Sequence, residues 1–409
     1  MSDKARLSAY KAFCRIENGA FSNLISDFEN LSDIDRAFAE SIAIGTLERK
    51  LTLEQVLSKR IKQSTKNDIK RLLMTGLYQI LYMDRVPDSA ACDETVDIAK
   101  RLFGRQNAGF VNAVLRDICR NKDSVYADID CSEGCIRYSV NQELYELIRL
   151  QYGELTDEIF SAFFGKSDVY LRVNTIKATA QEVASELGGE ALSEQTVVCK
   201  NAKNAISAIN SGKYYVQGLA SQKAVRLLSV EPGQTVIDVC ACPGGKSLGA
   251  AIDMKNEGKV LSFDLHKNKL PLIQASAKRL GIDIISTDVN DGRYVREDLV
   301  SAADRVICDV PCSGTGVMGS KPEIKYKSPK DFEGLYSTQS AILESAAKYL
   351  KAGGYMVYST CSINKIENEE VVRKFLSTNS GYTLIHEETC LPCGAEREGF
   401  YMAKIKREL

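Results

Sequence analysis

Apolar residues recur at helical spacing through the first 125 residues of the chain. Stretches such as DIKRLLMTGLYQILYM (68–83) and GFVNAVLRDIC (109–119) place apolar side chains three and four positions apart. The breaks between such stretches are turn-like, as in VPDS at 86–89. This pattern predicts an all-helical N-terminal domain over residues 1–125.

The periodicity changes farther along the chain. Residues 126–215 combine a helical stretch, NQELYELIRLQYG, with strand-like runs such as VYLRVNTI, which predicts a small α/β linker domain. From residue 216 to 409, short β-branched runs alternate with helical patterns; these runs are TVIDV, KVLSF, DIIST, RVICD and YMVYS. This alternation predicts a Rossmann-like α/β domain with a parallel, doubly wound sheet, whose ligands bind beyond the carboxyl ends of the strands.

Acidic residues and a glycine turn follow the first predicted strands of that sheet. DVCACPGGKS (238–247) lacks both the G-x-G-x-x-G fingerprint and the first glycine of a phosphate-binding loop. Asp264 ends the second strand, and Asp288 and Asp291 follow the third. Carboxylates can accept hydrogen bonds from a ribose and an adenine but repel phosphates, so the pattern favours S-adenosylmethionine, a sulfonium, over a dinucleotide or a triphosphate.

Two cysteines follow the next two predicted strands, Cys312 in CDVPCSGTG and Cys361 in VYSTCSI. Neighbouring parallel strands would bring both thiols to the sheet edge that carries the glycine turn. With only two histidines in the chain, a four-ligand zinc site is not expected, and HEETCLPC (386–393) is interpreted as a closing loop. A thiol beside a methyl sulfonium suits methylation of cytosine carbon 5, because a thiolate that adds to carbon 6 makes carbon 5 nucleophilic.

Charge and composition indicate what the protein binds and in which compartment it works. The 53 basic and 54 acidic residues nearly cancel, but the stretches 59–71 and 100–122 are locally basic, as expected for contacts with a phosphate backbone. The chain shows no secretory pattern and no apolar run long enough for a membrane span. We therefore expect a cytoplasmic protein whose thirteen cysteines stay reduced.

Several motifs resemble a known family. DVCACPGGKS, DVPCSGTG and YSTCS followed by NEEVV closely resemble the Sun group of ribosomal RNA cytosine-5 methyltransferases. The N-terminal stretches, including DRAFAESIAIGTLERKLTLEQVL and GFVNAVLR, are similar to the NusB-like RNA-binding domain that precedes the catalytic domain in bacterial small-subunit enzymes of this group. The resemblance covers nearly the whole chain and is weakest over 175–215.

The resemblance implies roles for individual residues. Cys361 would be the nucleophile, Cys312 would assist product release, Asp309 would face the cytosine edge, and Lys246 would lie between cofactor and base. Asp291 fits the family position better than Asp288. The residues that the resemblance implies for cofactor binding are Cys240, Ala241, Cys242, Pro243, Gly244, Gly245, Lys246, Asp264, Asp291 and Asp309.

The implied activity is transfer of a methyl group from S-adenosylmethionine to carbon 5 of a specific cytidine in 16S ribosomal RNA, by a monomer without a protein partner. Two alternatives remain: the same chemistry on transfer RNA, and a non-catalytic NusB-like RNA-binding factor.

The chain also departs from the family pattern. It has Met318-Gly319-Ser320 where an arginine pair is common, and we expect Lys321, Lys325 and Lys327 around Tyr326 to contact RNA instead. A Gln-Asp pair is replaced by Gln217-Gly218. Lys246 and a helix start at Asn364 and Glu367, which have capping-box spacing, are candidates for lowering a thiol pKa.

Overall fold

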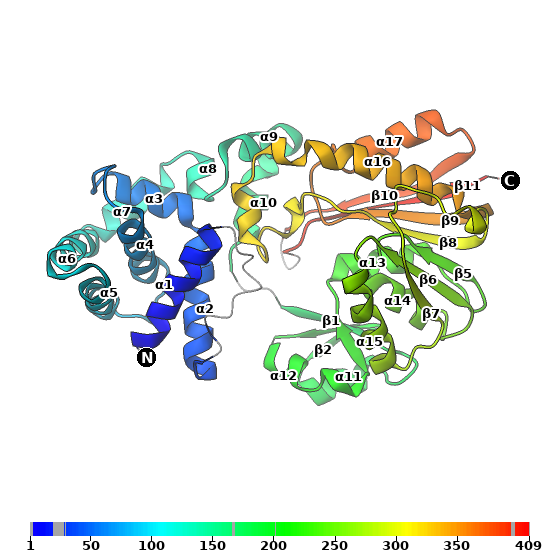
Figure 1. Cartoon of the computed structure of the whole chain (residues 1–409), viewed down its shortest axis with the longest axis horizontal. Helices are drawn as coiled ribbons and strands as arrows, with labels where there is room; N and C mark the ends of the chain where they lie inside the picture. Colours follow the sequence, from blue (N-terminus) through cyan, green and yellow to red (C-terminus); the bar gives the residue numbers. More distant parts are fainter. Residues whose placement is uncertain are drawn as a thin grey trace. The chain divides into compact units, whose positions relative to one another are not determined.

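The computed structural model of the chain describes residues 3–18, 28, 30–165, 168–200, 202–393 and 397–408 (Figure 1). They divide into two compact units. The helical unit contains 1–164 and the segment 318–329, and the sheet unit contains 165–317 and 330–409. Among the described residues, no helix is long and apolar enough to cross a membrane.

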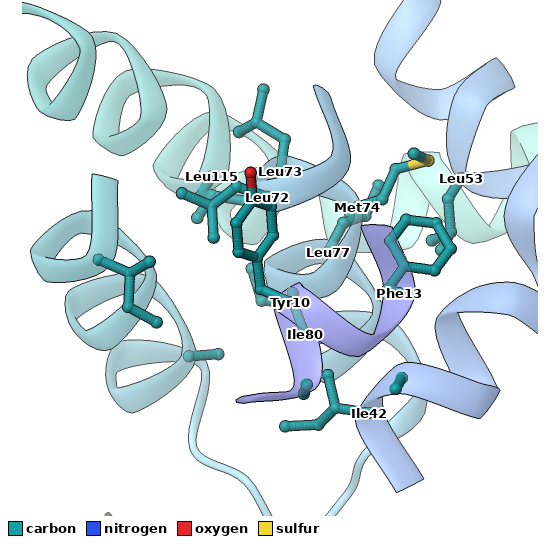
Figure 2. Close-up of a cluster of buried hydrophobic side chains, with 14 of the residues drawn as sticks. Tyr10, Phe13, Ile42, Leu53, Leu72, Leu73, Met74, Leu77, Ile80 and Leu115 are labelled. Atoms are coloured by element: carbon teal, nitrogen blue, oxygen red, sulfur yellow. The ribbon is translucent and has the colours of Figure 1, made fainter. Parts of the chain in front are cut away.

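The helical unit confirms the predicted all-helical N-terminal region. Its helices are α1 (Asp3–Glu17), α2 (Asp33–Glu48), α3 (Lys50–Ser58), α4 (Asn67–Tyr82), α5 (Asp88–Phe103), α6 (Arg105–Arg120), α7 (Lys122–Asp130), α8 (Gly134–Arg137), α9 (Gln142–Tyr152) and α10 (Thr156–Ala162), with the short 3-10 helices η2 (Gly153–Leu155) and η7 (Pro322–Tyr326). Side chains at helical spacing form one core, in which Phe13, Ile42 and Leu77 belong to three different helices (Figure 2). Burial of this shared apolar surface holds the bundle together.

The segment 318–329 packs as part of the helical unit. The ammonium group of Lys325 lies 3.4 Å from the carbonyl oxygens of Glu48 and Tyr138 and 3.8 Å from the ring centroid of Phe164. The hydroxyl of Tyr326 donates to the carbonyl of Leu47. Burial lowers the pKa of Lys325 to about 7, although Glu48 opposes the shift. The expectation that Lys325 contacts RNA is therefore wrong, because its side chain is buried. Tyr326 is partly buried and packs against the helical core.

A small antiparallel sheet opens the sheet unit. Its strands are β1 (Val169–Val173), β2 (Glu190–Ser193), β3 (Thr196–Cys199) and β4 (Tyr214–Val216), in the order β2-β3-β1-β4, with α11 (Ala180–Leu187), α12 (Ala202–Ser207) and η3 (Ile209–Ser211) between them. Arg172 forms a 2.6 Å ion pair with Asp253, and the Asn174 amide donates to the carbonyl of Leu280. These contacts attach the small sheet to the helices α14 (Gly245–Asp253) and α15 (Leu270–Leu280), which pack on the larger sheet. The division of the chain at residues 125 and 215 stays a prediction.

Within the described residues, the larger sheet has seven strands. They are β5 (Thr235–Asp238), β6 (Lys259–Asp264), β7 (Ile285–Val289), β8 (Ala303–Asp309), β9 (Leu350–Thr360), β10 (Tyr382–Cys390) and β11 (Phe400–Arg407), in the order β10-β11-β9-β8-β5-β6-β7. The five predicted strands pair in parallel, whereas β11 pairs antiparallel with β9 on one side and with β10 on the other. The sheet is thus mixed, because a helix connects β9 to β10, whereas β11 returns directly after β10 and runs opposite to both of its neighbours.

Helices cover both faces of this sheet (Figure 1). One face packs against α13 (Leu219–Leu228), α14 (Gly245–Asp253) and α15 (Leu270–Leu280), and the other against α16 (Glu333–Lys348) and α17 (Glu369–Thr378). Short 3-10 helices complete the unit: η4 (Lys267–Lys269), η5 (Glu297–Leu299), η6 (Thr315–Val317) and η8 (Pro329–Phe332). The two buried cores confirm a Rossmann-like layered architecture.

Candidate active site

The glycine turn connects β5 to α14 at the carboxyl edge of the sheet. Gly244 has φ of +107° and caps the start of α14, a backbone conformation that side chains disfavour. A Cβ atom at Gly244 would also lie 3.1 Å from the side chain of Ile273. The Cys242 amide donates to a carboxylate oxygen of Asp264 at 3.2 Å, which ties the turn to the end of β6.

Asp238 lies beneath this turn and is 1% exposed. Its carboxylate accepts a 2.6 Å hydrogen bond from the hydroxyl of Ser247, which itself accepts one from Ser262. Burial raises the pKa of Asp238 to about 7, although Ser247 opposes the shift. Asp238 therefore supports the turn from below.

A cavity of about 490 Å³ opens beside the turn. Its lining includes five of the predicted cofactor residues: Cys240, Cys242, Asp264, Asp291 and Asp309. Ala241, Pro243, Gly244 and Gly245 shape the turn itself. Acidic acceptors with an apolar wall formed by residues such as Ile342 suit a nucleoside that carries positive charge, so this donor set fits S-adenosylmethionine.

Sequence reasoning missed several lining residues: His266, Lys269, Arg293, Thr338 and Ile342. Arg293 makes a bidentate pair with Asp291, with Nη2 at 2.6 Å from Oδ2, and these bonds hold the pKa of Asp291 below its usual value. The position of Arg293, two residues after Asp291, was the available signal. No local pattern points to Thr338 and Ile342, because α16 is remote in sequence. Asp288 is exposed and pairs with Arg296 instead.

The two thiols come together where β8 and β9 end. These strands are parallel neighbours with Asp309 opposite Ser359, and the Cys312 and Cys361 sulfur atoms lie 3.2 Å apart. Gly316 lets the loop after β8 lie close to the backbone of Cys361 and Gly399, since its amide donates to the Cys361 carbonyl and a Cβ atom there would lie 2.0 Å from the Gly399 carbonyl oxygen. The hydrogen bond with Cys361, together with burial, raises the pKa of Cys312.

Lys246 and Asp309 form an ion pair at this edge, with Nζ 2.7 Å from Oδ2. The other Asp309 oxygen accepts a 2.7 Å hydrogen bond from the hydroxyl of Ser359. The Lys246 ammonium also lies 5.3 Å from the ring centroid of Phe400. The arrangement fixes a carboxylate between the cofactor cavity and the strand that leads to Cys361.

Glu367 differs from its predicted role as a helix cap. Within the described residues, α17 begins at Glu369, and Glu367 is fully buried beneath the thiol loops. Its charge contributes to raising the pKa of Cys312 rather than lowering it. The capping prediction for Glu367 is therefore wrong.

The predicted basic stretches lie on the helical unit. Several of their side chains are paired with acids, including Lys59 with Asp128 and Arg60 with Asp117. The exposed remainder includes Lys62, Lys66, Lys100, Arg105 and Arg120. As for metals, the described residues hold no cluster of three or more His, Cys, Asp or Glu side chains placed as ligands.

Comparison with protein families finds two matching models, one for the N-terminal helical region and one for the C-terminal sheet region. The model described as the 16S rRNA methyltransferase RsmB/F matches residues 225–406, and the NusB family model matches residues 3–120. The first covers the larger sheet with the thiol pair, and the second covers most of the helical unit.

Curated relatives extend the likeness to nearly full length. The chain is 34% identical to the probable ribosomal RNA small subunit methyltransferase B of Bacillus subtilis, covering 91% of this chain and 88% of the relative. It is 30% identical to ribosomal RNA small subunit methyltransferase B of Proteus mirabilis, covering 98% of each.

Solved structures share the fold. The crystal structure of PH0851 covers 100% of this chain and 99% of its own, with a TM-score of 0.80 and 24% identity. NSun6 from Pyrococcus horikoshii with SFG covers 65% of this chain and 98% of its own, with a TM-score of 0.59 and 20% identity.

Fold, cavity and family matches together define the class: an S-adenosylmethionine-dependent RNA methyltransferase with a NusB-like helical region. Within that class, the chain belongs to the RsmB/F family of 16S rRNA methyltransferases.

Proposed function

We propose that the protein methylates carbon 5 of a cytidine in small-subunit ribosomal RNA, with Cys361 as nucleophile and Cys312 as the group that assists release. The observation that carries this proposal is the 3.2 Å approach of two thiols at the carboxyl ends of β8 and β9, beside the acidic cavity. The names of the curated relatives support the choice of RNA.

The cavity residues divide the binding of the cofactor among them. Asp264, at the end of β6, would accept hydrogen bonds from the ribose hydroxyls. Asp291 would accept one from the adenine amine while it also pairs with Arg293. Residues 240–245 let the ligand lie against the backbone. When bound, S-adenosylmethionine supplies the methyl group.

In the first half of the reaction, the Cys361 thiolate adds to carbon 6 of the cytosine. The electron pair of the 5,6 double bond then becomes available at carbon 5, which takes the methyl group. Asp309, held by Lys246 and Ser359, accepts a hydrogen bond from the exocyclic amine and orients the ring. The RNA must present the target unstacked, since a stacked base hides carbon 6.

In the second half, carbon 5 loses its proton to solvent, the 5,6 double bond re-forms, and the bond from carbon 6 to sulfur breaks. The Cys312 thiol, within hydrogen-bond distance of the Cys361 sulfur, donates its proton to the departing thiolate and is then reprotonated by solvent. The raised pKa of Cys312 supports this role, because it keeps that thiol protonated at neutral pH.

The compartment, the oligomeric state and the RNA-contacting surface are also part of the proposal. We propose a cytoplasmic monomer: all thirteen cysteines lie within the described residues and none forms a disulfide, as expected in a reducing compartment, and one chain supplies both thiols and the cavity. The exposed basic residues of the helical unit would contact RNA phosphates. We keep the three-part division 1–125, 126–215 and 216–409 as a proposal.

Methyl transfer to defined RNAs tests the function. The purified protein would be incubated with labelled S-adenosylmethionine and either 16S ribosomal RNA or transfer RNA from cells that lack the protein, and nucleosides would be separated after digestion. We expect labelled 5-methylcytidine in the 16S sample and not in the transfer RNA sample. Label only in transfer RNA, or in no cytidine at all, would overturn the proposal.

A further inference from the structure

A buried polar cluster lies directly beneath the two thiol loops, and Glu367 is at its centre. The Glu367 side chain is 0% exposed. Its Oε1 accepts hydrogen bonds from the Ser313 amide at 2.7 Å and from the Gln339 side chain at 2.9 Å. Its Oε2 accepts one from the Ser362 hydroxyl at 2.7 Å and another from the Ser313 hydroxyl.

Two of these donors are the residues that directly follow the two cysteines in sequence. Ser313 directly follows Cys312, and Ser362 directly follows Cys361. The hydroxyls of Ser313 and Ser362 lie 3.2 Å apart, and Thr315 adds a 2.8 Å bond to Ser362. One carboxylate therefore ties together two loops that are 49 residues apart in sequence.

The hydrogen-bond donors around Glu367 are neutral amide and hydroxyl groups, so none of them cancels a negative charge on its carboxylate. Burying a carboxylate whose partners are all neutral is costly, and an uncharged acceptor could make several of the same bonds. The titratable groups that face Glu367 are Cys312 from the β8 loop, Tyr336 from α16 and Tyr358 from β9. Of these, Cys312 is the one adjacent to the proposed nucleophile.

We propose that Glu367 is a positioning residue that holds the two thiol loops in register and, through its charge, assigns attack to Cys361 and proton donation to Cys312. This inference rests on the proposed function. The sequence motifs alone do not say physically why one of two adjacent thiols should attack. A fixed negative charge that disfavours a second thiolate at Cys312 supplies that reason.

Glu367→Gln separates the charge from the scaffold. The glutamine oxygen can accept from the Ser313 amide and the Gln339 side chain, while its NH₂ group donates to the serine hydroxyls, which can rotate to accept. Glu370→Gln, on the exposed side of α17, removes an equal charge near the same turn and is the matched control.

Three readouts would be compared with wild type. We expect Glu367→Gln to lower turnover about tenfold, because the share of protein that attacks through Cys312 has lost its proton donor for release. RNA containing 5-fluorocytidine should form part of its adduct on Cys312 rather than all of it on Cys361. The alkaline limb of the turnover profile should move down by roughly one pH unit, because release needs a protonated Cys312 and loss of the nearby charge lowers that thiol's pKa. Glu370→Gln should match wild type in all three.

The outcomes distinguish the two proposals. Wild-type protein that forms no adduct contradicts the proposed function, whereas a normal wild-type adduct with Glu367→Gln indistinguishable from it overturns only this inference. Should Glu367→Gln fail to fold, Ser362→Ala decides: it keeps the charge but removes one tether. Reduced turnover with the adduct confined to Cys361 supports the inference, and wild-type turnover contradicts it.

Discussion

The protein contains a second pair of adjacent thiols, and comparing the two pairs shows what makes a thiol a candidate for catalysis. Cys92 on α5 and Cys119 on α6 have sulfur atoms 3.5 Å apart, nearly as close as the 3.2 Å between Cys312 and Cys361. Cys92 is 0% exposed and belongs to the apolar core of the helical unit. Proximity of sulfur atoms is therefore not the distinguishing feature.

The surroundings of the two pairs differ. Burial is the largest cause that raises the pKa of Cys92, to about 12, so this thiol is neutral packing material. For Cys312, the hydrogen bond with Cys361 is the largest cause of the raised pKa. Both Cys312 and Cys361 lie on strand-end loops with a buried carboxylate below them. Cys119 is as accessible as the strand-end thiols, but its partner Cys92 is buried in an apolar core, whereas the strand-end pair has a buried carboxylate below it and a ligand cavity beside it.

The largest expected difference is in the loss of activity on removing a sulfur. Cys361→Ala should lower methyl transfer by about 10³-fold or more, because the covalent step has no other nucleophile. Cys92→Ala should stay within about twofold of wild type, since that residue only packs. Initial rates with 16S ribosomal RNA measure both. Equal losses in the two variants would contradict the distinction between the pairs.

The next effect separates the two thiols of the candidate site. Cys312→Ala should complete the first methyl transfer but then accumulate protein bound covalently to ordinary RNA, with steady-state turnover reduced about 100-fold, because the leaving thiolate has lost its proton donor. Denaturing gels resolve the bound species. Cys119→Ala is the control from the helical pair and should leave no such species; clean turnover by Cys312→Ala would exclude a release role.

A smaller effect is expected from the polar support of the site. Asp309→Asn should reduce kcat/KM about 30-fold, because the amide accepts less strongly from the cytosine amine and weakens the pairing with Lys246. Asp304→Asn is matched to it, since Asp304 lies on the same strand and pairs with Lys351 at 2.8 Å. Similar rates for the two variants would show that Asp309 acts only as an ordinary strand-end acid.

The smallest expected effect is on stability, where the helical pair should matter more than the strand-end pair. Cys92→Ala should lower the free energy of unfolding by about 1 kcal/mol, because it leaves a void in a close-packed core. Cys361→Ala should change it by less than about 0.5 kcal/mol, since its half-buried side chain lies on a loop. Urea unfolding followed by circular dichroism compares them. A larger loss for Cys361→Ala would mean that the loop thiol is mainly structural.

Periodicity and strand-end reasoning predicted much of this architecture. Strands that are parallel neighbours bring their carboxyl ends together, so adjacency of Cys312 and Cys361 followed from the order of runs along the chain. Local pattern could not predict where Lys325 and Tyr326 lie, because their partners Glu48 and Leu47 are more than 270 residues away. A lysine beside a tyrosine in a loop is typical of an exposed surface, and only the tertiary packing buries it.

Glu367 illustrates the same limit at the site. Its spacing from Asn364 matched a capping box, a local motif, whereas its actual donors come from the β8 loop, the β9 loop and α16. An acid followed by asparagine within a short polar stretch gives no sign of full burial. Polar networks assembled from distant loops require coordinates.

The most direct test of the account is to identify the cysteine that carries a trapped pyrimidine. Wild-type protein, S-adenosylmethionine and 16S ribosomal RNA containing 5-fluorocytidine would be reacted, digested with nuclease and trypsin, and analysed by mass spectrometry. Cys361 lies in the tryptic peptide 352–365 and Cys312 in 306–325, so the two sites are separated. The account predicts the methylated fluoropyrimidine adduct on 352–365; an adduct on 306–325, or none on either peptide, would contradict it.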